Sequence, residues 1–318
     1  MERRTFMKRT LAGTALGLMG TGGFKALRAD ALGGDGGDGD GNGGKKIPIA
    51  VQVYSVRDAA EKDLAGTLKG LSEMGYKGVE FAGTYGHSAE DVKRMLADAG
   101  LVCFSTHIAL GDLLGENFDA TADYNRTIGN ATLIVAGGMG RVLADDGGNQ
   151  FAAYLFNELA LKAKKAGCRV GYHAHAGDFE FVDQPFPRTG AKFRAHTGNR
   201  GGIGGQETAW NLFFQRTVSD VIAEMDVGNC LDCGADPYSS MEKAPGRGRV
   251  IHLKASKTDG TLLGGEGDEV DWPRVFRICE ATAGTEWYIV EQEGGEETDS
   301  MNAVAGCLEN LRKMGKCS

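Results

Sequence analysis

The feature that most constrains the fold is a regular alternation of short apolar segments with amphipathic segments between residues 47 and 315. Eight segments are predicted as strands: 47–54, 78–81, 102–107, 132–136, 169–175, a part of 218–226, 249–254 and 286–291. Helices are predicted at 63–74, 88–99, 120–128, 150–166, 272–281 and 299–313. Strands that alternate with helices form a parallel sheet, and eight such units favour a closed (β/α)8 barrel over an open sheet. No GxGxxG sequence opens the first helix, which disfavours a dinucleotide-binding domain.

The first 31 residues are predicted to be an export signal. Residues 3–8, Arg-Arg-Thr-Phe-Met-Lys, resemble a twin-arginine signal. The apolar stretch 10–24 is too short and too rich in glycine to form a stable transmembrane helix. Small residues at Ala29 and Ala31 place cleavage after Ala31, so we expect a periplasmic or otherwise extracytoplasmic protein. The alternative is a basic, disordered N-terminus.

Two further segments interrupt the pattern. Residues 32–46 are almost wholly Gly, Asp and Asn up to residue 44 and are predicted to be a flexible linker. The folded domain should then span residues 47–318. Residues 185–206 are rich in Gly and Arg without clear periodicity. We expect them to form either a mobile surface insertion or a lid over an active site.

Composition narrows the classes of partner. The net charge of -8 argues against nucleic acid, which requires clustered Lys and Arg. Seven cysteines in a domain of this size imply no disulfide framework, and the single CxxC at 230–233 is a weak zinc signal. No membrane span is expected in the mature protein, and homo-oligomerisation is left open.

Polar side chains gather at the carboxyl ends of the predicted strands, where the sites of (β/α)8 barrels form. They are Glu80, His107, His173, His175, Asp226, His252, Lys254 and Glu291. Because alternate residues of a strand face the same side, His173 and His175 can share the lumen, as can His252 and Lys254.

These side chains suggest a metal centre. Four of the six histidines lie at or near predicted strand ends, next to Asp and Glu. Neutral imidazoles and carboxylates suit one divalent ion such as Zn, Mn or Co, and the surplus of polar groups favours a catalytic ion. Taken singly, a histidine can be a core residue and Asp226 can be a helix cap. His87 and His196 are interpreted as surface residues.

Several segments together resemble the xylose isomerase-like TIM-barrel superfamily, which also includes endonuclease IV-type proteins. The resemblance covers roughly residues 47–315. Its motifs are VQVYSVRD at 51–58, GVEFAG at 78–83, GYHAH at 171–175, DFEF at 178–181, MDVGN at 225–229, HLK at 252–254, GEG at 265–267 and VEQ at 290–292.

The resemblance implies that Asp226, His252 and Glu291 hold the metal. The fourth ligand is commonly Glu in the ketose epimerases, whereas this chain offers His173 or, as the weaker choice, His175. That departure puts simple ketose 3-epimerisation in doubt, because two metal-bound glutamates act as acid and base there. Two smaller departures are Ala174 in place of the family's Asn and the two extra residues at 176–177. The residues expected to bind substrate are Glu80, His107 and His175.

The predicted reaction is metal-assisted proton abstraction next to a carbonyl of an unphosphorylated carbohydrate or keto-sugar, as in an isomerase or epimerase. Glu291 or Lys254 would move the proton, since a lysine near a metal can have a lowered pKa. A keto-glycoside lyase or hydratase is the main alternative. The net negative charge disfavours an endonuclease IV-like phosphodiesterase, which needs a basic groove. A non-catalytic sugar-binding barrel is expected to have lost metal ligands, whereas the set in this chain is intact.

We predict that changing both Arg3 and Arg4 to Lys leaves the precursor in the cytoplasm, because the paired arginines are the feature that the twin-arginine interpretation depends on. Cell fractionation followed by immunoblotting measures the distribution of precursor and cleaved protein. Unimpaired export of the double variant would show that another route reads the segment.

Overall fold

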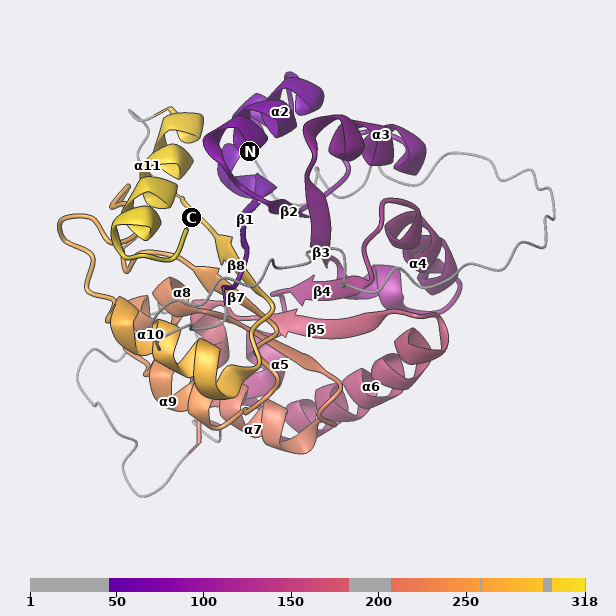
Figure 1. The fold of residues 1–318 in the computed structure, drawn as a ribbon. Coiled ribbons are helices and arrows are strands. Elements are labelled where there is room, and N and C mark those ends of the chain that lie inside the picture. The colour runs from indigo at the N-terminus through magenta and orange to yellow at the C-terminus, as the bar shows by residue number, and fades with distance from the viewer. Residues whose placement is uncertain (1–45, 183–206, 258, 294–298, 318) are drawn as a thin grey trace, which may run out of the picture. The chain divides into compact units, whose positions relative to one another are not determined.

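The computed structural model describes residues 46–182, 207–257, 259–293 and 299–317. The predicted signal peptide, all but the last residue of the linker, and the segment 185–206 lie outside these residues. Eight parallel strands close into a barrel in the order β1 to β8, with helices around the ring of strands (Figure 1). The predicted (β/α)8 TIM barrel is therefore confirmed. Among the described residues, no helix has the length and apolar character needed to cross a membrane.

The elements alternate along the chain as predicted. The strands are β1 (Ile49–Gln52), β2 (Gly78–Phe81), β3 (Val102–Ile108), β4 (Thr132–Ala136), β5 (Arg169–His173), β6 (Ile222–Asp226), β7 (Val250–Leu253) and β8 (Trp287–Val290). The α-helices are α1 (Arg57–Ala60), α2 (Leu64–Met74), α3 (Ala89–Ala99), α4 (Asn117–Thr127), α5 (Gly140–Ala144), α6 (Asp146–Lys165), α7 (Ala209–Arg216), α8 (Val227–Asp232), α9 (Pro237–Glu242), α10 (Trp272–Ile278) and α11 (Ser300–Lys313). Short turns of other helix types cover Val53–Val56, Leu110–Leu113, Ala176–Phe179 and Cys279–Ala283.

The sequence located the longer elements better than the short ones. Strands β2 and β4 have the predicted bounds, whereas β1 ends at Gln52 and continues as a 3-10 turn. Helices α1, α5, α7, α8 and α9 were not predicted. They have four to eight residues, and about two turns or less is too short for a 3.6-residue hydrophobic period to be recognised.

Side-chain caps and glycines fix the ends of the first long helices. The carboxylate of Asp63 accepts a hydrogen bond from the Gly66 amide at the start of α2, and the Ser88 hydroxyl caps α3 in the same way. Gly75 and Gly100 end these helices with φ of 113° and 67°, a left-handed conformation that costs glycine least.

The lumen of the barrel has an apolar floor. A separate cluster of buried residues draws one member from each of five strands, so its members meet inside the ring: Ala50, Ile134, Ile222, Val250 and Ile289. Strand alternation then places the residues two positions further along in the next layer of the lumen. In four of these strands that residue is polar: Gln52, Glu224, His252 and Glu291. The candidate site is therefore built directly on the apolar floor.

A bulge in β3 changes which of its residues face the lumen. Val79 of β2 pairs with Cys103, but the next residue, Glu80, pairs with Ser105. Phe104 is the extra residue between these pairs, and its side chain packs against the apolar floor. A bulge of this kind shifts the alternation of all following residues by one position.

The shifted alternation brings His107 into the site. Ser105 and His107 both face the lumen, where they contact Glu80 and Glu224, respectively. Thr106 points away and its hydroxyl donates to Asn125 of α4. Without the bulge, the apolar side chain of Phe104 would be followed by Thr106 in the lumen and His107 would face the helices.

The cysteines do not form a metal or redox site among themselves. All seven are free thiols. Burial raises the pKa of Cys230 and raises that of Cys233 to about 11, so both stay protonated at neutral pH. Among the described residues, the groups of side chains that could hold a metal ion contain no cysteine.

We predict that Gly171→Ala lowers the free energy of unfolding by about 1–3 kcal/mol through overpacking of the lumen. An added Cβ would lie 2.5 Å from Ile134 Cδ1 and 2.9 Å from the Ile222 carbonyl oxygen. Urea unfolding followed by circular dichroism gives the difference. The control is Gly111→Ala, where no atom lies within 4 Å and the change should be below about 1 kcal/mol. Equal stability of the two variants would contradict this packing.

Candidate metal centre

Four side chains at the carboxyl ends of β5 to β8 converge on one place. They are His173, Asp226, His252 and Glu291, and we call them the outer cluster. One ligand atom of each lies within 4.8 Å of those of the other three, and all four side chains are buried. These are the four residues that the sequence suggested as metal ligands. Of the two strand-five candidates, His173 joins the cluster.

Close contacts hold the outer cluster in place. His252 Nδ1 lies 2.5 Å from Glu291 Oε2, and His173 Nε2 lies 3.9 Å from Asp226 Oδ2. Asp226 also caps α8, because its Oδ1 accepts a hydrogen bond of 2.8 Å from the Asn229 amide. The Asn229 side chain donates to Oδ2 at 2.8 Å. Asp226 is thus both a helix cap and a member of the cluster.

Lys254 lies beside the outer cluster and is surrounded by carboxylates. Its Nζ is 2.9 Å from Glu293, 3.3 Å from Glu291 and 4.0 Å from Asp226. Burial alone would lower the pKa of Lys254, but Asp226, Glu291 and Glu293 outweigh burial and raise it. Lys254 is therefore an ammonium group here, suited to donate a hydrogen bond and to stabilise negative charge. The lowered pKa expected from the sequence applies to a lysine beside a bound metal ion and stays a prediction.

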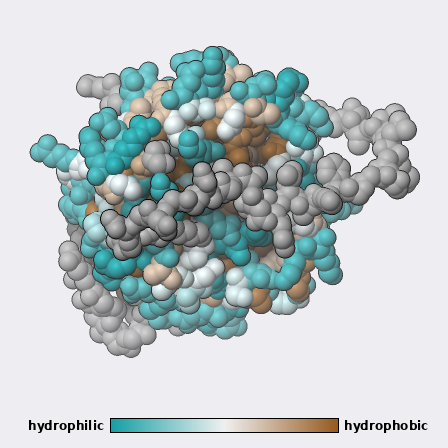
Figure 2. Space-filling model, viewed as in Figure 1, coloured by the Kyte–Doolittle hydropathy of each residue, from teal (hydrophilic) through white to brown (hydrophobic). Residues whose placement is uncertain are grey.

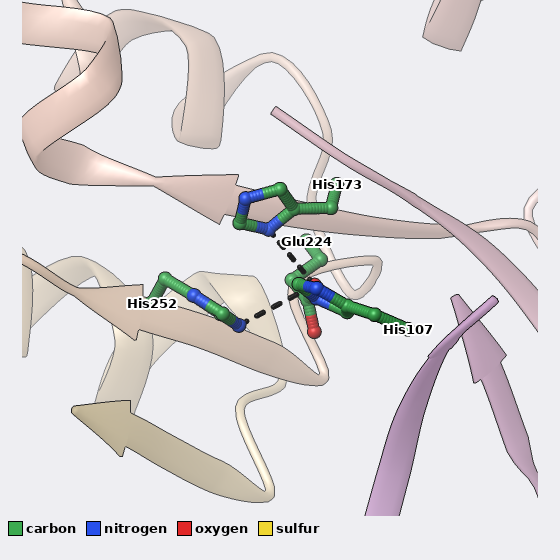
Figure 3. A group of neighbouring side chains, drawn as sticks. All are labelled: His107, His173, Glu224 and His252. Carbon is green, nitrogen blue, oxygen red and sulfur yellow. Dashed lines mark hydrogen bonds and ion pairs between the residues drawn. The ribbon is translucent and has the colours of Figure 1, made fainter. Parts of the chain in front are cut away.

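A second group of polar residues lies deeper in the lumen. It consists of Glu80, His107 and Glu224, and we call it the inner cluster. Glu224 Oε2 is 2.8 Å from His107 Nε2 and 3.0 Å from His173 Nδ1. Figure 3 shows the imidazoles of His107, His173 and His252 pointing toward the Glu224 carboxylate. The inner and outer clusters therefore share the two imidazoles that lie between them.

The three histidines around Glu224 differ in charge. Burial, together with the neighbouring imidazoles, lowers the pKa of His173, which keeps it neutral. For His107, burial is outweighed by Glu80 and Glu224, which raise the pKa to about 10. The pKa of His252 is also raised, against the effect of burial, by Glu224 and Glu80. The carboxylates therefore draw positive charge into the lumen.

The balance of charge in the lumen fits a divalent cation. Four buried carboxylates lie beside one lysine and two imidazoles of raised pKa, and the Oε1 atom of Glu224 is buried without a hydrogen-bond partner. Buried carboxylates are costly unless positive charge accompanies them. Imidazole nitrogen and carboxylate oxygen are the donors that Zn, Mn and Co accept. The residues present therefore fit the metal that the sequence suggested.

The comparison with protein families agrees with this architecture. Residues 68–314 match the family described as "Xylose isomerase-like TIM barrel". The chain belongs to this family. No curated protein matches it significantly.

Solved structures with the xylose isomerase-like fold resemble the chain at low sequence identity. Two structures of a sugar phosphate isomerase/epimerase from Parabacteroides distasonis have 22% and 24% identity and TM-scores of 0.67 and 0.68. They cover 88% and 86% of this chain and 100% of their own. An L-ribulose 3-epimerase has 14% identity and a TM-score of 0.54, covering 85% of this chain and 97% of its own. At these identities the likeness shows the fold.

In this xylose isomerase-like barrel, Glu80 is enclosed by protein. Its side chain has no exposed surface, and it contacts Gln52, Ser105, His107 and His252. The sequence suggested Glu80 as a substrate-binding residue. The structure instead places it behind the imidazoles, where it holds their orientation.

The other two expected substrate-binding residues lie closer to solvent. The His107 side chain is 10% exposed. His175 is exposed, and its ring packs against His173 with centroids 4.8 Å apart. Gly137, with φ of 71°, leaves room for this ring, because a Cβ there would lie 2.6 Å from His175 Nδ1. Of the remaining histidines, His87 is half-buried in the loop before α3, and His196 lies outside the described residues.

Sequence reasoning missed two residues of the site. Glu224 precedes Asp226 by two positions in β6, so strand alternation could have placed both carboxylates in the lumen. Asn229 lies in the MDVGN motif and holds both Asp226 and Lys254, accepting a hydrogen bond of 3.2 Å from the lysine. Its role depends on α8, a helix that the sequence did not reveal.

We predict that Asp226→Asn weakens zinc binding at the outer cluster by more than about 100-fold. Loss of a residue that only orients a metal ligand already lowers metal affinity by about 10–100-fold, and Asp226 is itself a proposed ligand. Asparagine keeps the oxygen that caps α8, so the fold should persist. Competitive zinc titration against a fluorescent chelator measures the affinity. Asp271→Asn is the matched control, since Asp271 caps α10 through the Arg274 amide. Equal zinc affinity in both variants would exclude Asp226 as a ligand.

Proposed function

We propose that the chain is a metal-dependent enzyme of the sugar isomerase/epimerase type that removes a proton next to a carbonyl. The observation that carries this proposal is the convergence of two imidazoles and two carboxylates at the carboxyl ends of β5 to β8, with Lys254 beside them. Barrels of this kind carry their active sites at this end. The structural neighbours named as sugar phosphate isomerases/epimerases and L-ribulose 3-epimerase support the same class.

His173, Asp226, His252 and Glu291 would hold one divalent ion. When bound, such an ion supplies polarisation of the carbonyl and hydroxyl oxygens of a sugar. A neutral His173 is in the form that binds metal. Asn229 would keep Asp226 oriented through two hydrogen bonds of 2.8 Å.

Glu291 and Lys254 form the proposed proton-transfer pair. Burial would raise the pKa of Glu291, but Lys254 and His252 lower it, so the carboxylate is ionised and can accept a proton. Lys254 Nζ lies 3.3 Å from Glu291 Oε1. The ammonium group would donate a hydrogen bond or a proton to an oxygen of the substrate, where negative charge develops as the carbon loses its proton.

The proposed substrate is an unphosphorylated carbohydrate or keto-sugar. The twin-arginine-like sequence at residues 3–8 supports this choice, because phosphorylated sugars are mostly internal to the cell. The periplasm or another extracytoplasmic compartment is therefore the proposed location. A small carbohydrate is the proposed partner of the site.

A keto-glycoside lyase is the second candidate. Glu291 and Glu293 both come from the end of β8, whereas the facing end of β5 carries His173 and His175. Epimerisation commonly uses a base and an acid on opposite faces of the carbon. With Glu291 and Glu293 on the same wall, the site suits removal of a proton followed by its return, or loss of a leaving group, on the same side.

The test uses zinc- or manganese-loaded protein incubated with keto-sugars and keto-glycosides in deuterium oxide. We expect solvent deuterium to enter the carbon next to the carbonyl, as detected by NMR and mass spectrometry. An isomer or epimer as product supports the isomerase, and an unsaturated product with a released aglycone supports the lyase. Absence of exchange and of binding across the panel would count against an enzyme of this class.

Lys254→Met is expected to retain the ion, since no ligand is lost, and to lower the rate of deuterium exchange by roughly 10²–10⁴-fold if Lys254 transfers a proton. Metal content and melting temperature are measured on the same sample. If Lys254 only pairs with the carboxylates, the variant loses stability more than exchange. Full exchange by the metal-loaded variant would remove Lys254 from the mechanism and leave Glu291 as the base.

A further inference from the structure

Four atoms around the inner cluster form a closed ring of contacts. His107 Nε2 lies 2.6 Å from Glu80 Oε1 and 2.8 Å from Glu224 Oε2. On the other side, His252 Nε2 lies 3.0 Å from the same Glu80 oxygen and 3.5 Å from the same Glu224 oxygen. The four side chains come from β2, β3, β6 and β7, so they approach a common centre from four directions.

The dimensions of this ring are those of a metal site. Ligand atoms that surround a tetrahedral zinc ion at about 2.0–2.1 Å stand about 3.3 Å apart. The edges of the ring span 2.6–3.5 Å, so its centre has room for an ion with only small movements of the side chains. Glu224 adds an independent observation, because its second oxygen, Oε1, is buried without a partner.

The inner ring and the outer cluster use opposite edges of the shared imidazoles. His173 turns Nδ1 toward Glu224 at 3.0 Å and Nε2 toward Asp226 at 3.9 Å. His252 turns Nε2 toward Glu80 and Nδ1 toward Glu291. An imidazole that releases its ring proton to solvent on metal binding can therefore contact the outer ion through one nitrogen and an inner ion through the other.

We propose that the inner cluster is a second divalent-cation site. Its own ligands are Glu80, His107 and Glu224, and the fourth is the nitrogen of His173 or His252 that the outer site leaves unused. Two carboxylates with two imidazoles favour Zn, Mn or Co over Mg or Ca. Three of its four ligands are not ligands of the outer site, and the assignment does not depend on the proposed reaction.

The burial of the inner site defines its role. The side chains of Glu80, Glu224 and His252 have no exposed surface, so no open position remains for water or substrate. Closed sites with four protein ligands are structural. An ion there neutralises the inner carboxylates and fixes the imidazoles that the outer site shares. It should also exchange more slowly than an ion in the outer site.

The experiment counts zinc ions in the full-length protein. Protein freed of metal by a chelator is incubated with excess zinc, desalted, and analysed by inductively coupled plasma mass spectrometry. We expect two ions per wild-type chain, one in Glu224→Gln and one in Asp226→Asn. Glu286→Gln is the control and should keep two ions, because Glu286 precedes β8 at the other end of the barrel and pairs with Arg249.

If wild type and Glu224→Gln each bind one ion, the proposal of an inner site is wrong. In that case a protonated His107 balances the negative charge of Glu80 and Glu224. If that single ion is lost in Asp226→Asn, the proposed reaction is unaffected. Two ions in Glu224→Gln, or none in this variant, also contradict the assignment. Circular dichroism confirms folding of each variant. If Glu224→Gln does not fold, His107→Asn replaces it, with the same expected loss of one ion.

Discussion

The structure depends on the need of buried carboxylates for positive charge. Glu80, Glu224, Asp226 and Glu291 all lie inside the barrel, and Lys254 is the one lysine that contacts them among the described residues. A buried carboxylate without a cationic partner would be protonated or would destabilise the fold. The imidazoles and the lysine meet this requirement, and the proposed metal ion would meet it as well. This explains why so many titratable groups can share a lumen whose floor is apolar.

The barrel provides this arrangement through simple rules of strand geometry. Alternation places a polar residue two positions after four of the five apolar floor residues, as in Ile222 to Glu224 and Val250 to His252. The bulge at Phe104 corrects the phase of β3 so that His107 joins them. The chemistry of the site is thus a consequence of register in the strands. A one-residue slip in any of these strands would exchange a ligand for an apolar side chain.

Membership of the xylose isomerase-like family explains the scaffold, and the particular residues define what is specific to this chain. His173 stands where the ketose epimerases that the sequence resembles commonly have Glu. The exchange removes one negative charge and one potential acid or base from the wall formed by β5. Glu291 and Glu293 follow the end of β8, and Lys254 contacts both of them and Asp226. This asymmetry shapes the proposed chemistry more than the fold does.

The sequence by itself determined the eight-unit barrel, most element positions and the outer cluster, because strand and helix periods and the convergence of strand ends are local or generic rules. Only the tertiary structure selected His173 over His175, placed Glu80 behind the imidazoles and raised the pKa of Lys254. It also revealed Glu224 as the centre of the inner cluster. These outcomes depend on distances across the lumen between strands far apart in the chain, and no local pattern specifies such distances.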